Sequence, residues 1–140
     1  MRIARGKEIM LERLKLLEEN ISELLKFRNK TSLVDIQNDK SKEWALRYGL
    51  IETIQIVIDI ACHMVSKYNL GNPSTYAECI ELLEKYAYID KTISMKLLGM
   101  VGLRNILIHE YVAVDNTKLY DLLKNIDDIR DFIHKIKDVI

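Results

Sequence analysis

The sequence contains very little proline or glycine, with one and five residues respectively in a chain of 140. Both residue types mark turns, so their scarcity favours helices over a fold rich in strands and loops. Basic and acidic side chains balance at 21 each, so the chain lacks the overall positive charge that attracts nucleic acids or membranes. It has no internal repeat and no linker rich in Pro, Gly or Ser. We expect a single domain that spans residues 1–140.

Signals for export and for membrane insertion are also missing. Glu8 and Glu12 interrupt the basic N-terminus before any apolar segment begins. The most apolar run, residues 50–65, includes charged residues such as Asp59 and is too short to cross a bilayer. Cys62 and Cys79 have no metal-binding spacing, and we expect both to be reduced and buried. These features predict a soluble, cytoplasmic protein without a cofactor.

Apolar residues recur at helical spacing through most of the chain. They predict an all-α protein, an antiparallel bundle of about five helices. The first three expected helices cover residues 8–28, a segment that starts near residues 39–41 and continues to about residue 68, and residues 75–86. A fourth opens after Asp90 and runs into residues 104–109, and the last opens at Asp115 or Asn116. Residues 29–41 are expected to form a loop with at most a short turn.

The second expected helix is apolar around more than one face, so we expect it to lie at the centre of the bundle or to face a second subunit. Gly71 and Pro73 are expected to end it. Thr75 and Glu78 have the spacing of a capping box, in which the two residues satisfy the first free amides of the next helix.

The segment "GLRNILIHEYVAVD", residues 102–115, places Arg104, His109 and Tyr111 among apolar residues. Its β-branched residues also suit a strand, but no other segment offers a partner strand, so we expect a helix end that runs into an extended turn. On an ideal helix Arg104 and Tyr111 share a face, while His109 is turned roughly 140° from Arg104. The three groups converge only if the helix loosens near His109 or if a second copy of the chain supplies the missing group. Burial of the aliphatic residues 106–108 would suit a subunit seam, but periodicity does not choose between the two.

Arg104 and His109 together suit cleavage of an RNA phosphodiester bond. A histidine can take the proton of a ribose 2′-hydroxyl or give one to the leaving 5′-oxygen. A guanidinium group can hold the phosphate through two parallel hydrogen bonds and stabilise the charge that builds on its oxygens. This route needs no metal ion.

A purely structural interpretation of the same residues is also open. Arg104 could pair with Glu110 or Asp115 near the helix end, and His109 could be a hydrogen-bonded group that stabilises the turn. Composition and spacing alone favour this structural interpretation.

In this segment the chain resembles the HEPN family, and within it the HepT-like toxins of prokaryotic two-gene systems. The signature of that branch is Arg-x4-His-x-Tyr, and residues 104–111 match it completely, including the Asn that follows the Arg. The stretches "RYGLIETIQIVIDIACHMV" and "NPSTYAECIELL" also resemble the second and third helices of this branch. The resemblance covers nearly the whole chain and leaves out only residues 1–7.

The resemblance implies a homodimeric, metal-independent endoribonuclease with a composite site at the subunit seam. Arg104 and His109 would be its catalytic pair, Asn105 a supporting polar residue, and tRNA or mRNA its substrate. It further implies a neighbouring antitoxin, an MntA-like minimal nucleotidyltransferase that transfers AMP from ATP to the tyrosine of the motif, here Tyr111. The bulk and negative charge of AMP beside Arg104 would exclude the RNA phosphate.

Four further polar residues are candidates for supporting roles. Asp59 and His63 lie four positions apart, which is too small a set for a metal site, and we expect a buried hydrogen-bonded pair that lines the dimer cleft. Gln55 lies a turn earlier on the same side. Arg47 is expected to reach an RNA phosphate or to pair with a neighbouring glutamate, Glu43 or Glu52.

Motifs of other enzyme classes are not visible in the sequence: it has no Gly-rich phosphate loop, no acid dyad and no Ser-His-Asp order. Our first hypothesis is therefore an RNA-cleaving toxin. The second is a non-catalytic HEPN-like interaction module that binds a nucleotidyltransferase or nucleic acid without cutting it. A helical assembly subunit is the third.

Overall fold

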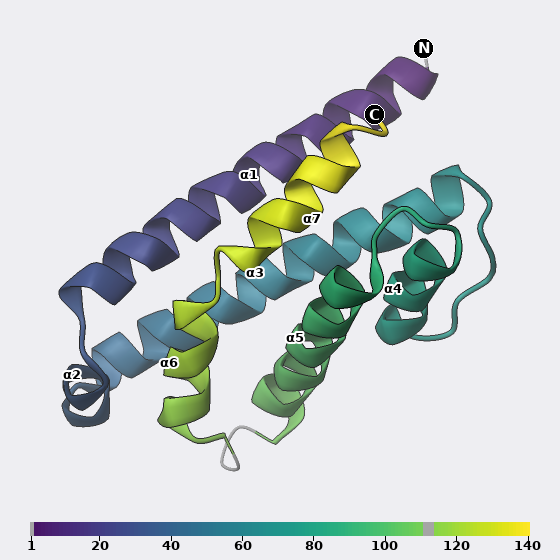
Figure 1. Cartoon of the computed structure of the whole chain (residues 1–140). Coiled ribbons are helices and arrows are strands. Elements are labelled where there is room, and N and C mark those ends of the chain that lie inside the picture. Colours follow the sequence, from purple (N-terminus) through teal and green to yellow (C-terminus); the bar gives the residue numbers. More distant parts are fainter. Residues whose placement is uncertain (1, 111–113) are drawn as a thin grey trace.

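The computed structural model describes residues 2–110 and 114–140, and these residues form seven helices and no strand. In chain order the helices are α1 (Arg2–Lys30), α2 (Leu33–Asn38), α3 (Lys40–Lys67), α4 (Tyr76–Lys85), α5 (Lys91–His109), α6 (Asn116–Lys124) and α7 (Asp128–Lys137). Figure 1 shows α3 running through the middle of the molecule, with α1 and α7 along one side and α4 and α5 along the other. The all-α prediction is confirmed.

Helix α3 is the centre of the bundle, as its sequence predicts. It packs against α1, α2, α4, α5 and α6. Eleven of its residues are buried, among them Leu50, Val57 and Met64, which widen its apolar face. Helix α3 is long and apolar enough to cross a membrane, but 56% of its most apolar 18-residue stretch is buried inside the fold. Core helices of globular domains have the same length and composition.

Two more helices form than the sequence predicts. The first is α2, in the segment expected to be a loop. Ser32 caps it, because its Oγ accepts from the backbone N–H of Asp35 while the Asp35 carboxylate accepts from the backbone N–H of Ser32. The hydrogen bond from the Ser32 backbone lowers the pKa of Asp35. Ile36 of α2 is buried, so this short helix closes one end of the core.

The second addition comes from a break in the last predicted helix. The N–H groups of Asn125 and Ile126 bond to carbonyls three residues back, which ends α6 in a tight turn before α7 begins. Arg28 of α1 donates to the Lys124 carbonyl at this end, at 3.2 Å. The break lets α6 pack on α2 while α7 packs on α5.

The capping predictions for the C-terminus of α3 and the N-terminus of α4 are only partly right. Asn69, with φ of 53°, makes the left-handed turn after α3, so Gly71 is not the capping residue. The Thr75 hydroxyl accepts from the Glu78 N–H at 3.2 Å, as predicted. The Glu78 carboxylate accepts from the N–H of Ser74 instead of that of Thr75, so the box is shifted by one residue.

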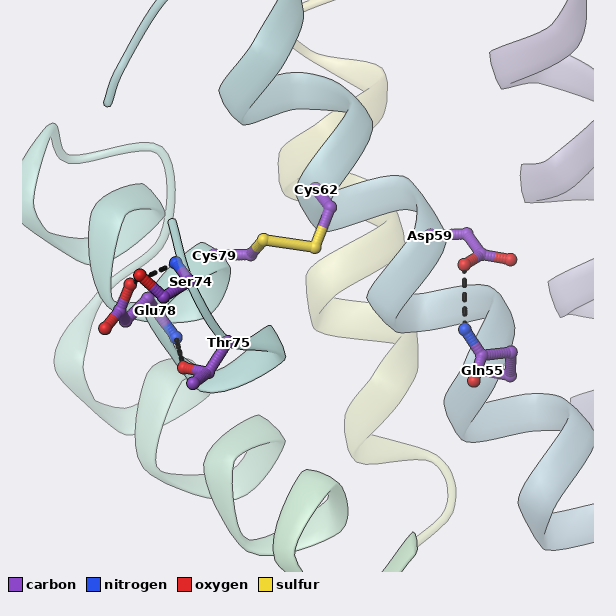
Figure 2. Close-up of a disulfide and its surroundings, with 7 residues drawn as sticks. All are labelled: Gln55, Asp59, Cys62, Ser74, Thr75, Glu78 and Cys79. Carbon is purple, nitrogen blue, oxygen red and sulfur yellow. Dashed lines mark hydrogen bonds between the residues drawn. A yellow bond between two sulfur atoms is a disulfide. The ribbon is translucent and has the colours of Figure 1, made fainter. Parts of the chain in front are cut away.

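The prediction that both cysteines are reduced is wrong. Cys62 of α3 and Cys79 of α4 form a disulfide with a Cα–Cα distance of 5.1 Å, beside the capping residues of α4 (Figure 2). That distance falls in the range that a disulfide requires. The separation of 17 residues along the chain gives no sign of the contact, because the connection between the helices folds back and places α4 against α3. The cysteines therefore give no support to a cytoplasmic location.

Candidate functional site

Arg104 lies on α5 and is held by two amide side chains. Its Nε donates to Oε1 of Gln55 on α3 at 2.7 Å, and one of its terminal nitrogens donates to Oδ1 of Asn105 at 3.2 Å. The side chain is half-buried. The predicted pairing with Glu110 or Asp115 does not form, because Asp115 instead caps α6 through the N–H of Thr117.

No carboxylate among the described residues neutralises the charge of Arg104. Across residues 2–110 and 114–140 its hydrogen bonds go only to the neutral amides of Gln55 and Asn105, and no carboxylate forms an ion pair with it. A guanidinium held by neutral groups keeps both its fixed position and its full charge. Such a group can bind an incoming phosphate without first breaking a salt bridge.

Asp59 determines the orientation of the Gln55 amide. The Nε2 of Gln55 donates to Oδ1 of Asp59 at 2.8 Å, one helical turn along α3 (Figure 2). Since an amide carries its donors at one end and its acceptor at the other, this bond turns Oε1 towards Arg104. Gln55 therefore belongs to the same strip as Asp59, as the sequence suggested.

Tyr76 is a member of the site that the sequence did not indicate. It is the first residue of α4, and the central carbon of the Arg104 guanidinium lies 5.2 Å from the centre of its ring. That distance is typical of a cation–π contact. No pattern in the sequence links residues 76 and 104, because the contact depends on how α4 packs against α5.

His109 is the last residue of α5 and is exposed. The helix does not loosen near it: the N–H of Glu110 still donates to the carbonyl of Ile106, at 2.7 Å. In a regular helix Arg104 and His109 are separated by roughly 140° around the axis and about 7.5 Å along it. The first of the two predicted routes to convergence is therefore not observed.

Asn105 lies between the two candidate catalytic residues. It is exposed, and it precedes His109 by one helical turn, so the two share one stripe of α5. Its Oδ1 is used by Arg104, whereas its NH₂ group has no partner among the residues that the structure describes. Asn105 thus presents free donors beside the Arg104 guanidinium.

Arg47 pairs with Glu43, one of the two predicted glutamates. Its Nε lies 3.1 Å from the Glu43 carboxylate, and a terminal nitrogen donates to the Val114 carbonyl at 3.1 Å and to Asn116 at 3.5 Å. Burial by itself raises the pKa of Glu43, but hydrogen bonds and charges from Lys40 and Arg47 outweigh that effect and lower it. Arg47 therefore ties the start of α6 to α3.

The predicted pair of Asp59 and His63 does not form. Asp59 is exposed and accepts from Gln55, and His63 is half-buried on the part of α3 near Arg13 and Lys67. Burial lowers the pKa of His63, and the two neighbouring cations lower it further. Gln55 and His63 lie four positions before and after Asp59, so both are within its reach on the helix. Asp59 accepts from Gln55 and not from His63.

Two further predictions concern metal ions and Tyr111. No group of three or more His, Cys, Asp or Glu that could hold a metal ion occurs within the described part of the chain. Tyr111, predicted as the AMPylated residue, lies outside the described residues.

A pocket of about 740 Å³ is lined by Tyr76 and Asn105, the two residues of α4 and α5 that contact Arg104. Its walls come from the disulfide, from the first turn of α4 with Tyr76 and Ala77, and from Val101 and Asn105 of α5. No acidic residue is among its lining residues.

Comparison with known proteins identifies the family of this chain. The family model described as Ribonuclease HepT-like matches residues 17–136. The tRNA nuclease HepT of Aphanizomenon flos-aquae is 30% identical over 112 residues, which are 80% of this chain and 76% of that protein. The mRNA nuclease HepT of Shewanella oneidensis is 33% identical over 81 residues, or 57% of this chain and 61% of that protein.

A solved structure shares the fold. The tri-AMPylated HEPN toxin of Shewanella oneidensis in complex with an MNT antitoxin superposes with a TM-score of 0.85 at 24% identity, covering 93% of this chain and 97% of that one. The helices described above are therefore arranged as in that structure.

Proposed function

Because the chain belongs to the HepT-like ribonuclease family, we propose that it is the endoribonuclease toxin of a toxin–antitoxin pair. In this proposal Arg104 and His109 cleave RNA without a metal ion. The observation that carries it is the uncompensated charge of Arg104, which is held in place by Gln55 and Asn105. A structural arginine of the same burial would be expected to pair with a carboxylate.

The proposed reaction is an internal transfer at phosphorus. His109 acts as a general base and takes the proton of the ribose 2′-hydroxyl, and O2′ then attacks the adjacent phosphorus. The bond to the 5′-oxygen breaks, and that oxygen leaves as a hydroxyl after receiving a proton from an imidazolium. Arg104 stabilises the charge on the phosphoryl oxygens. The products are a 2′,3′-cyclic phosphate and a 5′-hydroxyl.

A second copy of the chain is proposed to complete the site. Since α5 stays helical to its end, His109 of one copy faces away from Arg104 of the same copy. A two-fold seam along α5 would bring His109 of one copy towards Arg104 of the other. Ile106 and Ile108, each 39% exposed, flank His109 and supply apolar surface for such a seam.

We also propose that a nucleotidyltransferase controls this site. The related Shewanella toxin is AMPylated in its complex with an MNT antitoxin. We propose that an MntA-like partner of this chain transfers AMP from ATP to Tyr111, two residues after His109. The phosphate of AMP would then compete with RNA for Arg104. This function implies a cytoplasmic location, where both RNA and ATP are found.

The decisive experiment is RNA cleavage in excess EDTA, comparing the wild type with His109→Ala. Both proteins are expressed without a partner gene, and intact mass first establishes that Tyr111 carries no AMP. Cleavage by the wild type that leaves 2′,3′-cyclic phosphate ends and is lost in His109→Ala is the expected result, with a rate loss of roughly 10²-fold or more. Intact RNA with unmodified wild type would instead favour a non-catalytic HEPN-like module that binds its partner or RNA.

A further inference from the structure

The pocket beside Arg104 has a rigid aromatic wall. Tyr76 is 43% exposed although it begins a helix whose next turns are buried against α3 and α5. Thr75 caps that helix directly before it, and the disulfide fixes Cys79 three residues later (Figure 2). The ring is therefore an exposed flat surface whose position is set by the backbone on both sides.

We propose that this pocket binds one nucleobase of a single-stranded RNA, next to the phosphate that Arg104 holds. The inference rests on the proposed function and assigns to that site the subsite that reads the substrate. The base stacks against the part of the Tyr76 ring that the Arg104 guanidinium does not cover, and its phosphate lies towards that guanidinium. Unpaired RNA bases commonly stack on exposed aromatic side chains beside groups that bind the backbone phosphates.

The polar groups around the pocket fit a base better than an aliphatic or acidic ligand. Asn105 lines the pocket, its oxygen accepts from Arg104, and its NH₂ group has no partner among the described residues. An amide in that position can hydrogen-bond to an acceptor on the edge of a base. The remaining walls are mainly apolar, from Val101, Ala77 and the disulfide, and suit the faces of a ring.

The charge of the surroundings fits a ligand that is joined to phosphates. Among the described residues none that lines the pocket is acidic, and the Arg104 guanidinium lies 5.2 Å from the centre of the Tyr76 ring. A base that enters the pocket therefore brings its 3′ or 5′ phosphate towards a positive group. Its volume of about 740 Å³ lies within the range of small-molecule sites and accommodates a nucleoside.

The test is a double-mutant cycle between Tyr76 and the RNA. Full-length His109→Ala protein, which cannot cleave, is titrated with a fluorescein-labelled single-stranded RNA that contains the cleavage site of the wild type. A series of the same RNA carries one abasic residue at each nucleotide around the cleaved bond. We expect one abasic position to weaken binding by about tenfold. In the Tyr76→Ala, His109→Ala protein the same abasic position should cause no further loss.

Two more variants separate stacking from general damage. Tyr76→Phe keeps the ring and should bind as tightly as the parent. Tyr86→Ala removes another tyrosine of similar exposure, at the opposite end of α4, and should leave the cycle unchanged. The proposal is overturned if no abasic position weakens binding, or if the abasic loss persists undiminished in Tyr76→Ala.

These outcomes are distinct from failure of the proposed function. Cleavage by the wild type together with independence from Tyr76 removes the subsite alone. Binding with the expected dependence on Tyr76 but no cleavage, measured on an RNA scanned at every position, removes the nuclease and keeps the subsite. A protein that neither binds nor cuts RNA overturns both.

Discussion

The Nε of Arg104 donates to Oε1 of Gln55 at 2.7 Å, across the contact between α5 and α3. Asp59 holds the other end of the same amide at 2.8 Å. Within the described residues this chain of contacts orients the Arg104 cation through neutral amides, so the guanidinium can bind a phosphate through two parallel hydrogen bonds. Gln55 is thereby a positioning residue for the proposed reaction.

Gln55→Met should lower the kcat of RNA cleavage by about tenfold, because a hydrogen bond to a charged group contributes about 1.5–3 kcal/mol and part of this ordering is lost. Methionine has nearly the same volume, and its thioether sulfur is only a weak acceptor for the bond from Nε. Steady-state kinetics on a defined RNA measures the change. Gln37→Met on the exposed surface of α2 is the matched control and should have wild-type rates. An unchanged kcat in Gln55→Met would contradict the positioning role.

Reduction of the Cys62–Cys79 disulfide should lower the free energy of unfolding by about 3 kcal/mol, the value for a closed loop of this size. The physical reason is that the bond restricts the unfolded chain between α3 and α4. Urea denaturation with and without a reductant measures it. Cys62→Ala cannot form the bond, so its stability should not respond to the reductant. Equal sensitivity in that variant would show that the reductant acts elsewhere.

Ala87→Gly should stabilise the protein by about 1 kcal/mol. Ala87 follows α4 with φ of 63°, a left-handed conformation in which a Cβ is unfavourable and which glycine adopts freely. Thermal or urea denaturation measures the gain. Ala45→Gly places the same change inside α3 at an exposed position, and there we expect a loss of similar size. A loss at both positions would rule out relief of strain at Ala87.

Stability should fall as the pH is lowered from neutral through about 6.5, the ordinary pKa of histidine. Burial, and then Arg13 and Lys67, lower the pKa of His63 in the folded state, so the unfolded chain binds the proton more readily. As the pH falls, the loss of stability begins near the pKa of His63 in the unfolded chain and is complete below its pKa in the folded protein. Above the unfolded pKa, His63 is neutral in both states and has no effect. The lowered pKa of Glu43 acts only below its ordinary value of 4.5, outside this range.

Urea denaturation across this pH range measures the effect. The fall should be smaller in His63→Gln than in the wild type. His134→Gln alters an exposed histidine of α7 and should follow the wild type. A fall of the same size in His63→Gln would assign the pH dependence to other groups.

The sequence by itself determined the helical class, the central place of α3 and the starts of α4, α5 and α6. Each of these depends on local signals: apolar spacing, and capping side chains such as Thr75, Asp90 and Asp115 that bond to amides two or three residues away. Local signals for α2 are present too, in Ser32 and Asp35, although we expected a loop in that segment. The Arg-x4-His-x-Tyr motif is equally local, and it singles out Arg104 and His109.

Only the tertiary structure decided which groups surround Arg104. Gln55 and Tyr76 are separated from it by 49 and 28 positions, and the disulfide closes a contact across a connection that folds back. The break between α6 and α7 also depends on tertiary packing, because α6 packs against α2 whereas α7 packs against α5. The physical reason is the same in each case. Caps and apolar spacing act within a few residues along the chain, whereas these contacts depend on the packing of helices that the sequence leaves unplaced.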